Sequence, residues 1–269
     1  MKSIFNEEQK DYMIKNYLIL SYREIGNHLG FTERQIRGWL NNHGYNKNRK
    51  INDKYFDCID TPLKAYFLGL IYADGWICAN NNPRNYEFGI ELQSEDKYVL
   101  EKLNDELGGL NIISHKNPKI QYINGRKANS GHSDVLRVYS KPLVLSLKSN
   151  GIETNKSHKN IYPVVPKNLF FDWLRGYIDG DGCYYTNKIV NTYMHITCYS
   201  KEPLLYVQST LKEYNIKTTI YSENPKKYRL MCTDYNSMHS LVNHLYYQDD
   251  LFYLQRKYIK IKHLLGSVA

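Results

Sequence analysis

Two segments of the chain end in the same way after an apolar helical run. Residues 67–75 close with Asp-Gly at Asp74, and residues 174–182 close with Asp-Gly at Asp181. An acid in the last helical turn is unfavourable because the helix C-terminus carries partial negative charge, and two such acids brought side by side repel each other. The repeated arrangement therefore predicts that Asp74 and Asp181 hold metal cations.

Small residues recur four positions apart inside both runs, as Gly69 with Ala73 and Gly176 with Gly180. A glycine inside a helix costs roughly 1 kcal/mol relative to alanine, so these glycines need a packing reason. Small residues at this spacing let two helices approach closely. The two helices are therefore predicted to pack against each other and to bring their terminal acids together.

The two segments resemble the motif of the LAGLIDADG homing endonucleases. The second copy matches the polar end of the motif over residues 178–182, whereas the first departs at Tyr72, where the motif has an acid. In this family the acid before the final glycine binds the metal, and both copies retain it. The resemblance implies that Asp74 and Asp181 are catalytic ligands of Mg²⁺ or Mn²⁺, that the carbonyls of Ala73 and Gly180 assist them, and that each acid serves one DNA strand.

The sequence after each motif also repeats. Each copy continues with strand-like residues, at 86–92 and 193–199, and then with a helix, a second hairpin and a last helix. This order predicts an α+β fold with antiparallel sheets, and it matches the single-chain, two-repeat form of the family. The expected boundaries are a linker at 51–60, a first repeat at 61–160 and a second repeat at 161–269.

Residues 1–50 are predicted to form a separate helical unit. Capping-box patterns at 21–24 and 32–35 indicate helix starts, and Gly30 ends the helix between them. A helix, a tight glycine turn and a second helix resemble a helix-turn-helix DNA-binding unit. Arg34, Arg37 and Asn41 would then contact base edges from the recognition helix. Three-helix units that bind other proteins remain the alternative.

Basic residues gather in and around the second hairpins. An insertion near residues 116–133 lengthens the hairpin of the first repeat and mixes its cations with polar and aromatic residues, a mixture that suits phosphate anchoring together with base readout. Alternate residues of a strand face one way, so one sheet face can present such side chains to a major groove. The predicted DNA-binding residues of these hairpins are Lys116, Lys119, Arg126, Lys127, Arg137, Lys226, Lys227 and Arg229.

The family resemblance also implies residues near the cleavage centre. It places a basic residue after each second hairpin, and Lys156 and Lys257 are the best matches; either would orient water or stabilise the phosphate, with a solvated surface lysine as the alternative. Glu91 and Thr197 correspond to polar positions of the first hairpins that lie near the metals. Asp179 and Tyr72 are expected to belong to the helix interface.

Composition is consistent with a polyanionic partner. The formal net charge is +9, which favours nucleic acid but also occurs on lysine-rich solvated surfaces. The 5 cysteines are scattered without CxxC pairs, which argues against a zinc site or a disulfide framework and for a reducing compartment. With neither a signal peptide nor an apolar run of membrane length, the chain is expected to be intracellular and soluble, without a membrane partner.

Together these features predict a monomer with internal pseudo-twofold symmetry that cuts double-stranded DNA. The chain would be a metal-dependent, site-specific endonuclease, intron-encoded in an AT-rich phage or organelle genome. Two alternatives stay open, namely a DNA-binding regulator that does not cleave and an intron RNA maturase. An intein-embedded endonuclease is disfavoured because the sequence lacks a terminal His-Asn pair.

Deletion of residues 1–50 is expected to weaken DNA binding and to make it less salt-dependent, because fewer phosphates are neutralised. Cleavage of a high-affinity site should persist. Fluorescence anisotropy at several salt concentrations measures the affinity, and cleavage at limiting protein provides the second readout. Unchanged cleavage at limiting protein would contradict a role of this unit in DNA binding.

Overall fold

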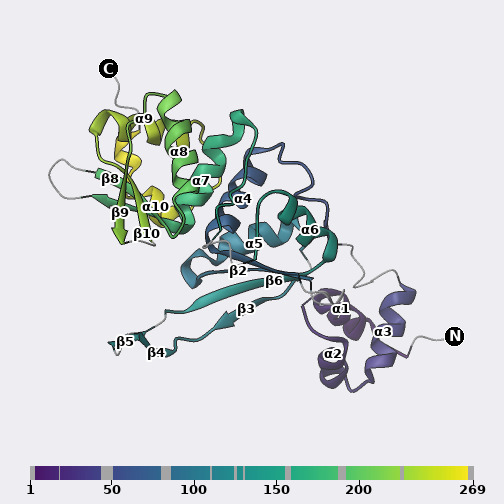
Figure 1. The fold of residues 1–269 in the computed structure, drawn as a ribbon. Coiled ribbons are helices and arrows are strands. Elements are labelled where there is room, and N and C mark those ends of the chain that lie inside the picture. Colours follow the sequence, from purple (N-terminus) through teal and green to yellow (C-terminus); the bar gives the residue numbers. More distant parts are fainter. Residues whose placement is uncertain are drawn as a thin grey trace.

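A computed structural model gives the fold of the chain (Figure 1). It describes residues 4–17, 19–43, 51–79, 86–109, 111–123, 126–129, 131–154, 159–186, 192–224 and 227–265. For Asn41, residues 120–123 and residues 126–129, it describes the backbone alone. No helix within these ranges is long and apolar enough to cross a membrane.

Three short helices form the N-terminal region: α1 (Glu7–Asn16), α2 (Tyr22–Leu29) and α3 (Glu33–Asn42). The predicted capping boxes are present, since the side chains of Ser21 and Thr32 accept hydrogen bonds from the backbone three residues later. Gly30 ends α2 in the left-handed region, at φ 75°, where glycine is favoured. The helices enclose a small core of their own, formed by Phe5, Met13, Ile25, Ile36 and Leu40.

Two repeats of mixed helix and strand follow, as the sequence predicts. The elements of the first repeat are α4 (Pro62–Asp74), β1 (Gly75–Ala79), β2 (Tyr86–Gln93), η1 (Ser94–Asp96), α5 (Lys97–Glu106), β3 (Ile113–Lys116), β6 (Ser133–Tyr139) and α6 (Lys141–Ser149). The elements of the second repeat are η3 (Lys167–Leu169), α7 (Phe170–Asp181), β7 (Gly182–Thr186), β8 (Thr192–Cys198), α8 (Glu202–Glu213), β9 (Thr219–Asn224), β10 (Lys227–Cys232) and α9 (Tyr235–Leu245). The short helices α10 (Gln255–Tyr258) and η4 (Lys262–Leu264) complete the described chain.

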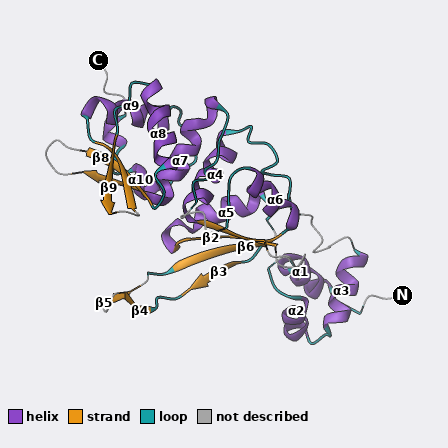
Figure 2. Ribbon diagram, in the orientation of Figure 1, coloured by secondary structure: helices purple, strands orange, loops and turns teal. Residues whose placement is uncertain are grey.

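The two sheets share one topology. The strand orders are β1-β2-β6-β3 and β7-β8-β10-β9, with every neighbouring pair antiparallel. Each first strand therefore pairs with the second, and the fourth lies between the second and the third. Helices cover one face of each sheet (Figure 2). These matched orders confirm an α+β fold of two pseudo-symmetric repeats.

The insertion of the first repeat forms an additional hairpin. Strands β4 (Ile120–Ile123) and β5 (Arg126–Asn129) follow β3 and precede β6 along the chain, and they pair with each other (Figure 1). Their ladder is separate from the four-stranded sheet. The second repeat has no such pair of strands among its described residues. The first repeat therefore carries a hairpin in addition to its four-stranded sheet, which the described part of the second repeat lacks.

Helices α4 and α7 pack against each other at the centre of the shared core. Glycines at the contact allow their backbones to approach each other closely. A Cβ atom added at Gly69 would overlap the backbone carbonyl of Trp173, and one added at Gly176 would overlap that of Tyr66. The relation is reciprocal, as expected across a pseudo-twofold axis. The predicted packing reason for these glycines is thereby confirmed, because no side chain larger than hydrogen fits at either contact.

Replacement Gly176→Ala is expected to destabilise the protein by more than about 2 kcal/mol, because the added methyl group meets backbone that cannot move aside. The midpoint of urea unfolding measures the loss. Gly131→Ala is the matched control, since a Cβ at Gly131 meets nothing within 4 Å. Equal midpoints for the two variants would contradict the close helix contact.

Candidate metal centre and nucleic-acid interface

The two predicted metal ligands are the last residues of α4 and α7. Each helix passes directly into a strand, because Gly75 and Gly182 adopt extended backbone immediately after the acid. The Asp74 carboxylate lies against the last turn of α7, where a Cβ at Gly180 would be 2.9 Å from Asp74 Oδ2. The packing of the helices thus brings the two motif ends together, with Asp74 half-buried and Asp181 exposed.

A small cavity opens beside Asp181. Its volume is about 110 Å³, and it is lined by Tyr72, Ala73, Tyr177, Asp181, Thr197, Cys198 and Tyr199. It therefore joins the last turns of both helices to the end of β8. Thr197, predicted to neighbour the metal, lies in this lining. Cys198 and Tyr199 were missed from the sequence, although they directly follow Thr197 along the chain.

The donor set suits a hard divalent cation. Carboxylates and backbone carbonyls are oxygen ligands, and Mg²⁺ is commonly bound by one or two carboxylates together with water and substrate phosphate. Within the described part of the chain, no group of three or more His, Cys, Asp or Glu residues could hold a metal. The pair Asp74 and Asp181 therefore fits a cation shared with a phosphate better than an all-protein site.

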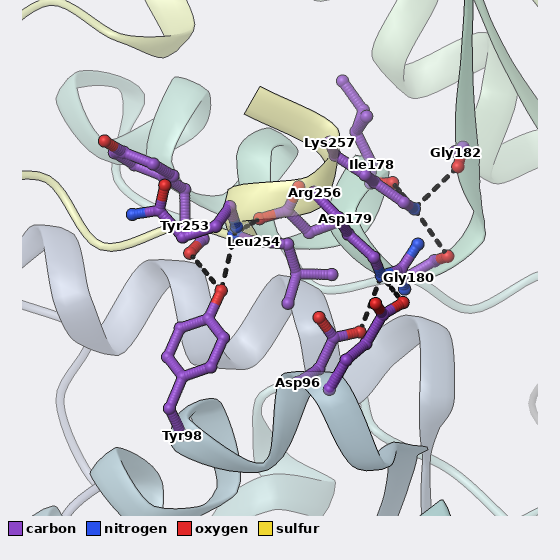
Figure 3. Close-up of polar contacts among 12 residues, drawn as sticks. Asp96, Tyr98, Ile178, Asp179, Gly180, Gly182, Tyr253, Leu254, Arg256 and Lys257 are labelled. Atoms are coloured by element: carbon purple, nitrogen blue, oxygen red, sulfur yellow. Dashed lines mark hydrogen bonds and ion pairs between the residues drawn. The ribbon is translucent and has the colours of Figure 1, made fainter. Parts of the chain in front are cut away.

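Lys257 is buried against the C-terminal end of α7 (Figure 3). Its amine donates hydrogen bonds to the backbone carbonyls of Ile178, Gly180 and Gly182, at 2.7, 3.0 and 2.7 Å. Burial lowers the pKa of Lys257, and the nearby carboxylates, Asp74 and Asp181 among them, act in the opposite direction. The amine thus binds the end of α7 itself. To donate a hydrogen bond to water or phosphate, it would have to give up one of its hydrogen bonds to these carbonyls.

Asp179 and Tyr72 lie in the helix interface, as the sequence predicts. Asp179 is 1% exposed and accepts hydrogen bonds from the Tyr66 hydroxyl (3.0 Å) and the Leu254 backbone N–H (2.8 Å). Burial raises the pKa of Asp179 to about 6. Tyr72 is also buried, and its hydroxyl donates to the carbonyl of Ile161 at 3.1 Å.

Glu91 occupies the position in the first repeat that Thr197 occupies in the second. Ile90 pairs with Gly75, and Ile196 pairs with Gly182, so the next residue along each strand is equivalent. Glu91 accepts hydrogen bonds from Lys116 and Ser133, both at 2.6 Å. In the first repeat this position therefore binds the predicted DNA contact Lys116.

The predicted DNA contacts on the sheets are held by acidic neighbours. Lys227 lies 2.7 Å from Glu223, and Arg229 pairs with the same carboxylate. Arg137 lies 3.6 Å from Glu87 and over the ring of Trp76. Apart from the exposed Arg137, these side chains are half-buried. A phosphate would compete with the acids for the same cations.

The other predicted contacts are placed as follows. Arg34 and Lys119 are exposed. Arg37 pairs with Glu33 and lies over the Tyr22 ring. The side chains of Asn41, Arg126 and Lys127 are not described, and Lys156 and Lys226 lie outside the described residues.

Comparison with known proteins identifies the family to which this chain belongs. Residues 61–150 and 171–245 match the model of the LAGLIDADG-like domain. The chain therefore belongs to the LAGLIDADG family, in the single-chain form with two repeats. The match covers most of both repeats, including both terminal acids.

Two similar proteins extend this finding. An uncharacterized protein of Methanocaldococcus jannaschii is 27% identical over 219 residues, which cover 77% of this chain and 73% of that protein. The structure of the homing endonuclease I-WcaI bound to its DNA recognition sequence superposes with a TM-score of 0.52 at 15% identity, covering 76% of this chain and 87% of the other. At that identity the superposition shows a shared fold.

Replacement Glu223→Gln is expected to strengthen DNA binding several-fold, because it releases both Lys227 and Arg229 for phosphate contact. Fluorescence anisotropy with a duplex at moderate salt measures the change. The control Glu213→Gln adds the same charge at the end of α8, where Glu213 pairs with Lys167, on the helical side of the sheet. Equal gains in the two variants would indicate a general charge effect and contradict a DNA contact on β10.

Proposed function

We propose that the protein is a site-specific DNA endonuclease of the homing type, which hydrolyses both strands of a long asymmetric duplex with Mg²⁺ or Mn²⁺. The observation that carries this proposal is the pair of acids at the adjoining ends of α4 and α7. A regulator that only binds DNA is expected to lose such ligands. Retention of both acids, at the cost of placing negative charge on two helix C-termini, favours cleavage.

Asp74 and Asp181 would hold the metal, each for one strand, with the carbonyls of Ala73 and Gly180 beside them. The bound cation would neutralise charge on the scissile phosphate and stabilise the leaving oxygen. Lys257 fixes the orientation of the Gly180 carbonyl by donating to it. Its positive charge also offsets part of the negative potential that the two acids and the helix ends create.

The two sheets would lie along the duplex, with their uncovered faces toward the major groove. Lys116, Arg137, Lys227 and Arg229 have exposed or half-exposed side chains on these sheets. Such cations contact phosphates, and arginine also reads guanine edges. The extra hairpin of the first repeat lengthens the contact on one side, which suits a target whose two halves differ. I-WcaI, with the same fold, is bound to a DNA recognition sequence.

The N-terminal helices would extend this contact. Arg34 and Arg37 project from α3, which follows a capped turn at Gly30 as the recognition helix of a helix-turn-helix unit does. The region has its own core, so it can be present or absent without changing the core of the two repeats. A role in protein contacts is the alternative for this region.

Replacements Asp74→Asn and Asp181→Asn are each expected to slow cleavage by on the order of 100-fold or more while DNA binding persists, because the amide keeps the shape but removes the charge that binds the metal. The substrate is duplex DNA that joins the two flanks of the protein's own coding region, incubated with Mg²⁺ and resolved strand by strand. Asp249→Asn, in an exposed loop, removes the same charge elsewhere and should leave the rate unchanged.

The same assay separates the alternatives. Tight binding of intact DNA by the unaltered protein, with no cut in either strand, would contradict the endonuclease and favour a regulator. Splicing of a host intron only when the protein is added would favour a maturase.

A further inference from the structure

A short segment near the C-terminus, residues 252–258, contacts both repeats (Figure 3). We call this segment the strap. Toward the first repeat, the Tyr98 hydroxyl donates to the carbonyl of Tyr253 at 3.1 Å and accepts from the N–H of Gln255 at 2.8 Å. Toward the second repeat, the N–H of Leu254 donates to Asp179 at 2.8 Å. The strap is therefore held from both sides within three residues.

An ion pair adds to the contact with the first repeat. Arg256 Nε donates to Asp96 Oδ2 at 2.8 Å and lies 3.4 Å from Glu95 Oε1. Asp96 is 2% exposed. A carboxylate removed from water in this way depends on its partner far more than a surface acid does. Arg256 is thereby tied to η1 of the first repeat.

The next residue points the other way. Lys257 reaches the end of α7 in the second repeat, where its amine binds three carbonyls. The helix α10 that carries both residues is only four residues long, which is too short to be stable through its own backbone hydrogen bonds. Side-chain contacts must therefore set its orientation, and with it the starting point of the Lys257 side chain.

We propose that Arg256, held by Asp96, is a positioning residue that fixes the Lys257 amine at the junction of Asp74 and Asp181. The catalytic meaning of this position rests on the proposed endonuclease function, whereas the position itself rests on the contacts of the strap. A displacement of about 1 Å in a reacting constellation can cost on the order of 100-fold in rate. A contact on one repeat would in this way control a side chain at the end of the other.

The test compares Arg256→Leu, which removes the ion pair, with Arg256→Lys, which keeps a cation at the same place. Lys97→Leu is the control, because Lys97 forms an exposed pair with Glu101 at 3.0 Å, one residue after Asp96. The first readout is acetylation of Lys257 in the full-length protein by limiting acetic anhydride, quantified by mass spectrometry. The second is the single-turnover cleavage rate at saturating protein, with DNA affinity measured separately in Ca²⁺.

In Arg256→Leu, Lys257 should be acetylated about tenfold faster and cleavage should slow about tenfold or more at unchanged DNA affinity. Arg256→Lys should restore part of both values, and Lys97→Leu should change neither. Should Arg256→Leu fail to fold, Asp96→Asn weakens the same contact while keeping the arginine, and the same two readouts apply.

Equal protection of Lys257 in Arg256→Leu and in the unaltered protein would overturn the positioning role, even if cleavage fell. Faster acetylation with an unchanged cleavage rate would overturn its catalytic consequence. Absence of cleavage by the unaltered protein would instead refute the endonuclease function, and the acetylation readout would still decide whether Arg256 positions Lys257.

Discussion

The close contact between α4 and α7 is the constraint on which the other features depend. Two helices whose backbones meet at Gly69 and Gly176 cannot slide or rotate without collision, so their C-termini hold one fixed relation. Both acids lie at those C-termini, and the first strand of each sheet begins at the next residue. One packing contact therefore sets the distance between the carboxylates and the relation between the two sheets. Electrostatic repulsion opposes the arrangement, and the buried apolar surface of the two helices stabilises it.

The two motif copies differ two residues before the terminal acid, where the first repeat has Tyr72 and the second has Asp179. Both side chains form hydrogen bonds within the structure, so neither is free for catalysis. Tyr72 binds the carbonyl of Ile161, in the segment that joins the repeats, while Asp179 binds Leu254, in the strap. Each helix thus uses this position to hold a connecting segment against the interface. In the first repeat, Tyr72 makes this contact where the family motif has an acid, and the terminal acid Asp74 is present in the same helix.

Local sequence patterns were sufficient for much of the fold. The helix caps and the succession of helices and strands along the chain were predicted from the sequence, because each depends on neighbours a few positions away. The contact between the two helices joins residues far apart in the chain, and it was predicted from the repetition of the glycines and acids. The pairing of Glu223 with Lys227 and Arg229, and that of Glu91 with Lys116, was not predicted, because it depends on strand register. The contacts of Asp96 and Tyr98 with the strap join residues far apart in the chain, and a four-residue helix has too little periodicity to be recognised.

The burial of α4 also affects how the chain folds. Every residue from Ala65 to Tyr72 is buried, with no solvent-facing side to the helix along this stretch. Part of that cover comes from α7 and from the strap, which are synthesised much later. A ribosome-bound first repeat would therefore expose an apolar helix, and folding must wait for contacts of high sequence separation, which slow folding and expose nascent chains to aggregation.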